Sequence, residues 1–451
     1  MQLTEYMQIL TDQIRCKKAH PMIVEEYQAH IEDQADAYIQ EGMGKEDAIE
    51  AAIAQMGDPV EAGVALDRVH RPKMCASLMM TILVLTLIGI VAQSVIFKDV
   101  DNTYVQETYL LRSIAYNLIG FAVMAMICYL DYSFLSKHIL GFYGGWYLVV
   151  IFLNHFFEAG IFGGSYSSQR VLIYQLLAFF PPIYAGILFH YRNQGIKGFS
   201  KAVLLLFLAI PPITASDKMS GCVELYAVVV VLWTSAFLKG WYGNKRWLKV
   251  SLLWTFVLLL PASVIAKIVM GPAGSYRAVR LKAFFNPEAY AGAEGYITTQ
   301  IQNIVGKLNF AGSITSLQNQ LPNSYNDFII LSIFSYFGIV IGLLVCGFII
   351  FFFVKAFGIS IKQKNQLAQM VGLSCVMELL MRALIYIAAN FGLCPLAQMN
   401  MPFLSFGLTG TLVNSVLAGL LLSIYRYENV LSEKQMSSNY RYRLKIEKIN
   451  S

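Results

Sequence analysis

The segment NFGLCPLAQMNMPFLSFGLTGTLVN, residues 390–414, is the most unusual part of the chain. It holds two prolines and three glycines, yet it joins two apolar runs, 366–391 and 405–425, that are near the length needed to cross a bilayer. Irregular backbone at membrane depth is tolerated only where it is buried in protein or lines a cavity. The segment therefore predicts a polytopic membrane protein with a cavity beside the outer ends of its last helices.

The composition supports a membrane protein. The chain is 57% hydrophobic and 14% charged, with a mean hydropathy of +0.54, whereas soluble domains are about 45–50% apolar and about 25% charged. The seven cysteines form no CxxC pair and the six histidines form no cluster. Neither a disulfide framework nor a metal site is expected, and nothing suggests a nucleic-acid partner.

Apolar runs recur along the chain from Met74 onward, each close to the roughly twenty residues that span a membrane. They predict an all-α polytopic fold with about ten transmembrane helices. The fifth run ends in IPP, which predicts a broken or tilted helix. The expected spans are 74–97, 110–130, 139–157, 172–190, 202–214, 221–238, 250–270, 327–354, 366–391 and 405–425.

The distribution of basic residues sets the expected topology. Lys and Arg gather in alternate loops and after the last span, as the positive-inside rule requires of cytoplasmic segments. With an even number of spans, both termini are expected in the cytoplasm. The connection 271–326 would then be a large extracytoplasmic loop, and Asp327 would lie at the outer face of the cytoplasmic membrane.

The N-terminal 73 residues predict a small cytoplasmic helical domain. They contain helical apolar spacing at Leu3, Met7, Leu10 and Ile14, and they lack the apolar core of a signal peptide. This domain resembles the prefix domain that precedes some bacterial permeases. The membrane domain is expected at 74–427, followed by a basic cytoplasmic tail at 428–451.

Ionisable residues matter at three places at or within the expected spans. Glu378 and Arg382 are four residues apart, so they share one helix face and are expected to form a structural ion pair. Asp217 lies in a short outer turn, where it can cap a helix. Asp327 is open to two interpretations, since it can cap the following helix or act as a general base at a half-desolvated face.

The outer loop contains a basic cluster, Arg277, Arg280 and Lys282, which departs from the positive-inside rule. Basic residues there can bind an anionic headgroup or a pyrophosphate. The alternative is that they snorkel to ordinary lipid.

Four ordered motifs together resemble the SEDS family (shape, elongation, division and sporulation) of FtsW/RodA/SpoVE-type proteins. The segment 390–407 is similar to the family's NxGLLPxTGxPLPFxSYG, and Asn414 falls on the Asn that follows it. RAVRLKAFFNPEAYAGAEGY, residues 277–296, is similar to RxxRxxAFLNPexxxxGxGYQ. LPNSYNDF, residues 321–328, is similar to LPEAHTDF, and Asp217 falls on the Asp of the family's QPDLG turn.

The chain departs from the family pattern at several acids. Phe334 to Gly338 replace GEE(L/F)G, and Asn323, Tyr325 and Asn326 replace Glu, His and Thr of LPEAHTDF. Pro182, Ile183 and Gly186 stand at the Ser, Glu and Lys positions of QPSExxK, which removes an intramembrane acid–base pair. The Glu378–Arg382 pair stands elsewhere and can partly compensate.

The resemblance implies a peptidoglycan glycosyltransferase that polymerises lipid II beside a class B penicillin-binding protein, in cell division, elongation or sporulation. It implies Asp327 as the catalytic base. It also implies substrate contacts from Arg277, Arg280, Lys282, Asp217, Ser405 and Asn414. No cofactor is evident, and a divalent-cation requirement stays open, although no carboxylate cluster calls for a metal.

Two other functions remain open. The first is a non-catalytic scaffold or regulator of a wall-synthesis complex, which the lost acids favour. The second is a translocator of lipid-linked precursors, which predicts ionisable groups along a path through the membrane midplane.

Overall fold

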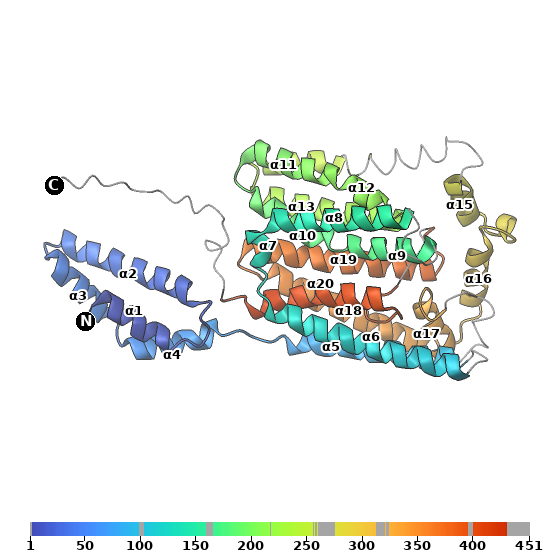
Figure 1. The fold of residues 1–451 in the computed structure, drawn as a ribbon, viewed down its shortest axis with the longest axis horizontal. Helices are drawn as coiled ribbons and strands as arrows, with labels where there is room; N and C mark the ends of the chain where they lie inside the picture. The colour runs from blue at the N-terminus through green and yellow to red at the C-terminus, as the bar shows by residue number, and fades with distance from the viewer. Residues whose placement is uncertain are drawn as a thin grey trace.

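The computed structural model describes residues 2–98, 103–158, 166–216, 218–255, 257, 259, 276–312, 321, 324–395 and 400–430. Within these ranges every regular element is a helix (Figure 1). The helices are α1 (Leu3–Asp12), α2 (His20–Gln40), α3 (Lys45–Gln55), α4 (Pro59–His70), α5 (Ala76–Phe97), α6 (Thr103–Tyr129), α7 (Phe134–Lys137), α8 (Ile139–Glu158), α9 (Tyr166–Leu177), α10 (Phe180–His190), α11 (Gly195–Leu208), α12 (Ile210–Thr214), α13 (Met219–Leu238), α15 (Tyr276–Phe285), η1 (Glu288–Tyr290), α16 (Tyr296–Val305), α17 (Ile329–Phe337), α18 (Ile339–Ile361), α19 (Gln366–Asn390) and α20 (Leu408–Arg426).

Nine helical spans in the described part of the chain are long and apolar enough to cross a membrane. The predicted all-α polytopic fold is thereby confirmed, and the protein is a multi-pass membrane protein. Residues 246–255 are helical and begin the expected span 250–270, most of which lies outside the described residues. The fifth span is broken between α11 and α12, just before Pro211 and Pro212, as its sequence predicts.

The expected continuous span 327–354 is wrong. The chain forms the short helix α17, turns at Gly338 with φ +88°, and continues as the crossing helix α18. The amides of Ile339 and Val340 donate to the carbonyls of Asn309 and Phe310, at 3.0 and 3.4 Å. A side chain at position 338 would meet the Ala311 backbone, so this break requires glycine.

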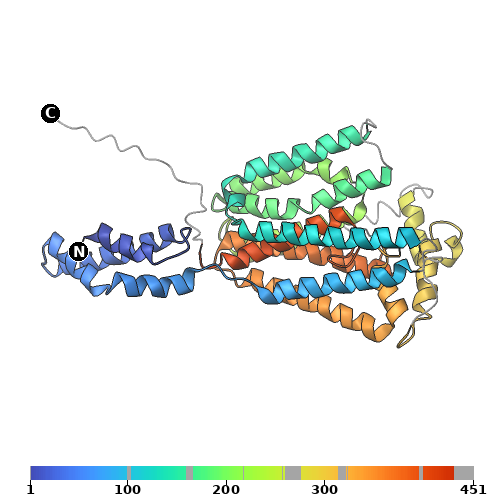
Figure 2. The same ribbon diagram turned by 60° about the horizontal axis from the view of Figure 1, so that its bottom comes forward.

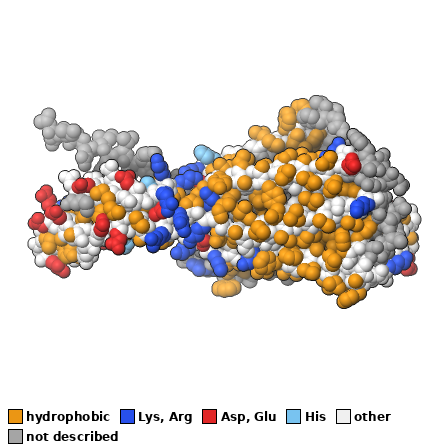
Figure 3. All heavy atoms as spheres, turned by 90° about the horizontal axis from the view of Figure 1, so that it is seen from below, with side chains coloured by type: hydrophobic (Ala, Val, Ile, Leu, Met, Phe, Trp, Pro, Cys, Tyr) orange, Lys and Arg blue, Asp and Glu red, His pale blue; other side chains and the backbone are white. Residues whose placement is uncertain are grey.

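Helix α19 is the centre of the bundle. It packs against α10, α13, α18 and α20, and two thirds of its most apolar stretch is buried within the protein. The outward side chains are apolar: Leu111 is 68% exposed and Leu148 is 67% exposed. Figure 3 shows this apolar surface, with Lys and Arg gathered where the bundle meets the N-terminal helices. An apolar belt beside a basic band is what a membrane-spanning bundle requires.

The N-terminal helices α1–α4 lie beyond one end of the bundle, and α15 and α16 lie at the opposite end (Figures 1 and 2). Within the N-terminal group, Arg15 binds Asp67 of α4 through its backbone amide and its guanidinium, at 2.6–3.0 Å. Lys18 forms an ion pair of 2.6 Å with Asp131 of the membrane part. His70 Nδ1 lies 2.5 Å from the carbonyl oxygen of Asn429, which ties α4 to the end of the last span.

Candidate functional site

Helix α19 positions the start of α17, where Asp327 lies. The first amides of a helix have no partner inside the helix, and the N-cap of α17 is Phe328, whose side chain makes no capping bond. Tyr386 supplies one acceptor, since its hydroxyl receives the Ile329 amide at 2.9 Å. Asn390 supplies another, since its Oδ1 receives the Leu331 amide at 3.1 Å. Two capping bonds of α17 therefore come from α19.

The backbone on both sides of the Asp327 peptide is fixed by the same two side chains. Tyr386 donates its hydroxyl to the Asn326 carbonyl at 2.5 Å, and Asn390 donates its Nδ2 to the Asp327 carbonyl at 3.0 Å. The side-chain Nδ2 of Asn326 also donates to Asp327 Oδ1 at 3.0 Å. Asp327 itself is half-buried. It is a carboxylate with a fixed backbone at the edge of the bundle.

The irregular segment after α19 closes on the same place through Ser405. The Ser405 hydroxyl accepts from the Met401 amide at 2.7 Å and donates to the Asn326 carbonyl at 2.9 Å. Gln93 of α5 donates to the Leu404 carbonyl at 2.8 Å, and Met401 and Leu404 are both buried. The Met401 amide and the Leu404 carbonyl are thus satisfied within the protein, as membrane depth requires.

Aromatic rings surround this point. Tyr325 lies 5.1 Å from Phe97, 5.7 Å from Tyr109 and 6.0 Å from Phe406, measured between ring centroids. Burial, and then the neighbouring Tyr109 and the Asp327 carboxylate, raise the pKa of the Tyr325 phenol above its ordinary value of 10.0. Tyr325, which precedes Asp327 by two residues, thus belongs to an aromatic wall with Phe97, Tyr109 and Phe406.

An apolar groove of about 500 Å³ runs beside this site, between α5, α17 and α18. Ile333 and Phe337 of α17 line it, together with Val91 and Ala92 of α5 and Phe348 of α18. Its walls are hydrocarbon, which suits an acyl or prenyl chain rather than a sugar.

The other predicted site residues are placed less directly. Arg277, Arg280 and Lys282 lie on α15, at the same end of the bundle as α17 (Figure 1), where Arg280 is half-buried and Lys282 is exposed. Asn414 is buried in α20. Asp217 lies outside the described residues. The structure thus joins Ser405 to the Asp327 segment by a direct contact, and it puts the basic cluster on the same face.

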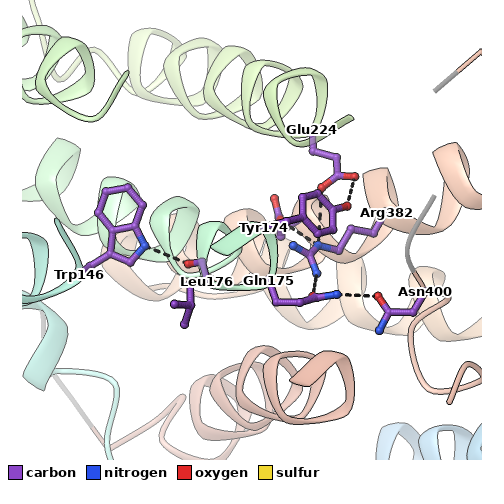
Figure 4. A network of polar contacts seen from close by, with 8 residues as sticks. Trp146, Tyr174, Gln175, Leu176, Glu224, Arg382 and Asn400 are labelled. Atoms are coloured by element: carbon purple, nitrogen blue, oxygen red, sulfur yellow. Dashed lines mark hydrogen bonds and ion pairs between the residues drawn. The ribbon is translucent and has the colours of Figure 1, made fainter. Parts of the chain in front are cut away.

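A second polar group lies inside the bundle, on α9, α13 and α19 (Figure 4). Arg382 Nε is 3.0 Å from Glu378 Oε1 and 3.7 Å from Glu224 Oε2, and all three side chains are at most 3% exposed. Tyr174 donates its hydroxyl to Glu224 Oε1 at 2.6 Å, while its ring lies 4.9 Å from the guanidinium carbon of Arg382. Gln175 accepts from Arg382 Nη1 at 2.6 Å.

Glu224 was not predicted as part of any site. It is the one acid within the apolar span Met219–Leu238, and an ionisable residue inside a span is by itself a sign of a partner. The family's acid and base positions on α10 are filled differently here. Ile183 is buried, and a Cβ at Gly186 would meet Ile139 of α8 at 2.6 Å. Tight apolar packing has replaced the charged pair at that place.

No group of three or more His, Cys, Asp or Glu side chains in the described part of the chain is arranged to hold a metal ion. The expectation of no metal site stays a prediction, because Asp217 and most of the loop before α15 lie outside that part.

The comparisons with known proteins agree with this architecture. Residues 193–430 match the FtsW/RodA/SpoVE family, described as a cell cycle protein. The probable peptidoglycan glycosyltransferase FtsW of Alteromonas naphthalenivorans is 27% identical over 243 residues, which cover 51% of this chain and 44% of that protein. The protein of the same name from Thioalkalivibrio sulfidiphilus is 24% identical over 377 residues, which cover 77% of this chain and 88% of that protein.

A solved chain described under "Structural coordination of polymerization and crosslinking by a peptidoglycan synthase complex" has a similar fold. Its TM-score is 0.60 at 15% identity, over 78% of this chain and 98% of that one. The chain spans about half the length of the first curated relatives it matches.

Proposed function

Because the chain belongs to the FtsW/RodA/SpoVE family of cell cycle proteins, we propose that it is a peptidoglycan glycosyltransferase. It polymerises lipid II at the outer face of a bacterial cytoplasmic membrane, during division, elongation or sporulation. The observation that carries this proposal is the half-buried Asp327 carboxylate, whose backbone is held by Tyr386, Asn390 and Ser405, while Tyr386 and Asn390 also accept from the first amides of the helix that follows. A carboxylate whose backbone is fixed in this way suits catalysis.

The reaction follows from the chemistry of the substrate. Asp327 accepts the proton of the acceptor sugar's 4-hydroxyl as the oxygen attacks C1 of the donor sugar. The bond from C1 to the pyrophosphate oxygen breaks, and the undecaprenyl pyrophosphate leaves with the bonding electrons, so the α linkage becomes β. Arg277 and Arg280 of α15 balance the pyrophosphate charge. The aromatic wall of Tyr325, Phe97 and Phe406 keeps water from competing with the acceptor.

The proposed function also implies the orientation of the protein in the membrane. Residues 1–73 and the tail 428–451 lie in the cytoplasm as a helical domain and a basic segment, and the loop 271–326 lies outside with α15 and α16. A class B penicillin-binding protein is the expected partner, which is supported by the similar fold of a chain from a peptidoglycan synthase complex.

A non-catalytic scaffold is the second candidate. The observation that favours it is the apolar packing at Ile183 and Gly186, where the family carries an acid and a base. A protein that kept only the fold would be free to lose such groups.

The test is polymer formation from labelled lipid II by the purified protein, followed on a gel, with and without a class B penicillin-binding protein. Asp327→Asn keeps the size of the side chain but removes the base, so we expect a loss of about 100-fold to 10,000-fold in rate. Glu288→Gln is the matched control, since Glu288 is an exposed acid of the same outer region. Equal activity of wild type and Asp327→Asn would contradict a base role, and no polymer from folded wild type would favour the scaffold.

A further inference from the structure

We propose that Arg382, acting through Gln175, is a positioning residue for Asp327. The buried polar group that contains Arg382 fixes the segment 400–405, and this segment in turn holds the Asn326–Asp327 peptide. This inference rests on the proposed function, because it assigns a role to a group outside the reacting atoms. It concerns the side chains that Figure 4 shows in contact.

The first step is the fixed direction of the guanidinium. Arg382 is 3% exposed and lies between two carboxylates, Glu378 and Glu224, each 1% exposed. The Tyr174 ring covers one face at 4.9 Å. A guanidinium is planar and can only donate hydrogen bonds. Held on these sides, it has one orientation, and that orientation points Nη1 at Gln175.

The second step is the orientation of the Gln175 amide. Because Arg382 is only a donor, Gln175 must present its carbonyl oxygen to it, at 2.6 Å. The amide nitrogen of Gln175 then faces Asn400 and donates to its Oδ1 at 2.8 Å. The Asn400 amide nitrogen in turn occupies the space beside Gly410, where a Cβ would lie only 1.6 Å from it. The hydrogen bonds from Arg382 to Gln175 and from Gln175 to Asn400 form a relay, and the direction of both bonds is set by Arg382.

The third step joins this relay to the candidate acid. Asn400 is followed by Met401, whose amide donates to Ser405 Oγ at 2.7 Å. The same hydroxyl donates to the Asn326 carbonyl at 2.9 Å, and the side-chain Nδ2 of Asn326 donates to Asp327 Oδ1 at 3.0 Å. A path of hydrogen bonds, joined through the residues Asn400 and Asn326, thus runs from the bundle interior to the Asp327 carboxylate.

A role only in holding α9, α13 and α19 together would be met by the bonds among Tyr174, Glu224, Glu378 and Arg382. The bond from Gln175 to Asn400 leaves that helix group and reaches an irregular segment. This bond adds nothing to helix packing. Breaking it therefore tests the positioning of Asp327 separately from the stability of the bundle.

The experiment compares Gln175→Leu, which breaks both relay bonds, with Tyr174→Phe, which removes one bond of the same buried group but leaves the relay. For Gln175→Leu we expect kcat of lipid II polymerisation to fall about 10-fold to 100-fold, as for a small misplacement of a catalytic group, with KM changed less than about 3-fold. Tyr174→Phe, assayed well below its unfolding temperature, should keep kcat within about 3-fold of wild type. Equal losses of kcat in the two variants would overturn the proposal.

A double variant tests the path itself. Gln175→Leu combined with Ser405→Ala should lose little more than the single variants, because both cut one relay. Losses that multiply would show that the two residues act separately, and would overturn the proposal.

A readout without turnover separates this inference from the proposed function. In a Cys222→Ser, Cys394→Ser background, Asp327→Cys is treated with a membrane-impermeant thiol reagent. Adding Gln175→Leu should change the modification rate at least about 3-fold, while adding Tyr174→Phe should not. A changed rate, if the protein with Asp327 intact makes no polymer, would support positioning and contradict the enzyme. An unchanged rate, if the protein with Asp327 intact is active, would overturn positioning and leave the enzyme standing.

Discussion

Two ion pairs in this protein have similar geometry and opposite surroundings. Lys18 and Asp131 meet at 2.6 Å where the N-terminal helices touch the membrane bundle, and their side chains are 45% and 22% exposed. Arg382 and Glu378 meet at 3.0 Å inside the bundle and are 3% and 1% exposed. Water and salt screen the first pair, whereas nothing but other polar side chains compensates the second. The comparison shows that the expected loss of stability on breaking an ion pair depends on how buried the pair is, rather than on the distance between its charged atoms.

The largest effect should come from Arg382→Met. It leaves the carboxylates of Glu224 and Glu378 buried without a cation, which is expected to lower the free energy of unfolding by about 3–5 kcal/mol. Thermal unfolding in detergent measures it. The triple variant Arg382→Met/Glu224→Gln/Glu378→Gln is the control and should recover at least half of the loss, since no charge is then left uncompensated. A loss below about 1 kcal/mol in the single variant would show that solvent reaches the group.

A smaller loss is expected from Tyr174→Phe. The change removes one hydrogen bond to the Glu224 carboxylate and keeps the ring against Arg382. A hydrogen bond to a charged group contributes about 1.5–3 kcal/mol, so the unfolding midpoint should fall between wild type and Arg382→Met. A midpoint equal to that of wild type would contradict a bond made in the dry interior.

Lys18→Ala should have a small effect, under about 1 kcal/mol, because the pair is partly exposed. Docking of the N-terminal helices on the bundle can be followed by hydrogen exchange at α4. The difference from wild type should vanish near 1 M salt, where the screening length is about 3 Å. Lys17→Ala is the matched control, since Lys17 is an exposed neighbour. An equal effect of both changes would mean that net charge matters and the pair does not.

The smallest effect is expected from a change of pH near neutrality on the docking of the N-terminal helices to the bundle. Burial alone would raise the pKa of Asp131, but the bonds from Lys18 and Ser133 outweigh it and lower that pKa below 3.8. Burial would likewise lower the pKa of Lys18, but Asp131 raises it above 10.5. The contribution of the pair is therefore constant between about pH 5 and pH 9. It is lost as the pH falls from about 4 through the lowered pKa of Asp131, and as the pH rises beyond the raised pKa of Lys18. Protection factors at α4 that change between pH 6 and pH 8, after division by the intrinsic exchange rate at each pH, would point to a histidine instead.

The sequence predicts most of this fold because its signals are local. Apolar length defines a span, and Pro211 and Pro212 mark a break, without knowledge of any neighbour. The break at Gly338 is different, since it depends on carbonyls of Asn309 and Phe310 that approach only in the folded chain. A glycine inside an apolar run does not by itself indicate a turn.

The candidate site, like the fold, has some features that the sequence predicts and others that depend on distant parts of the chain. Asp327 and the Glu378–Arg382 spacing can be read from short motifs, but the partners of Arg382 come from helices far along the chain. Glu224 lies in α13, and Gln175 in α9 is separated from Arg382 by 207 residues. Nor does the sequence near Asp327 indicate that Tyr386 and Asn390 cap its helix, because a distant side chain replaces the local cap that propensity favours.

The capping of α17 by α19 has a consequence for how the protein is made. Residues 329–331 are fully buried, and two of their amides find acceptors only on Tyr386 and Asn390. A nascent chain that has emerged only as far as α18 cannot satisfy these donors. The Asp327 end of the bundle is therefore completed late in biogenesis, after α19 has entered the membrane, and a ribosome stalled before that point holds a protein with spans but without an ordered Asp327 segment.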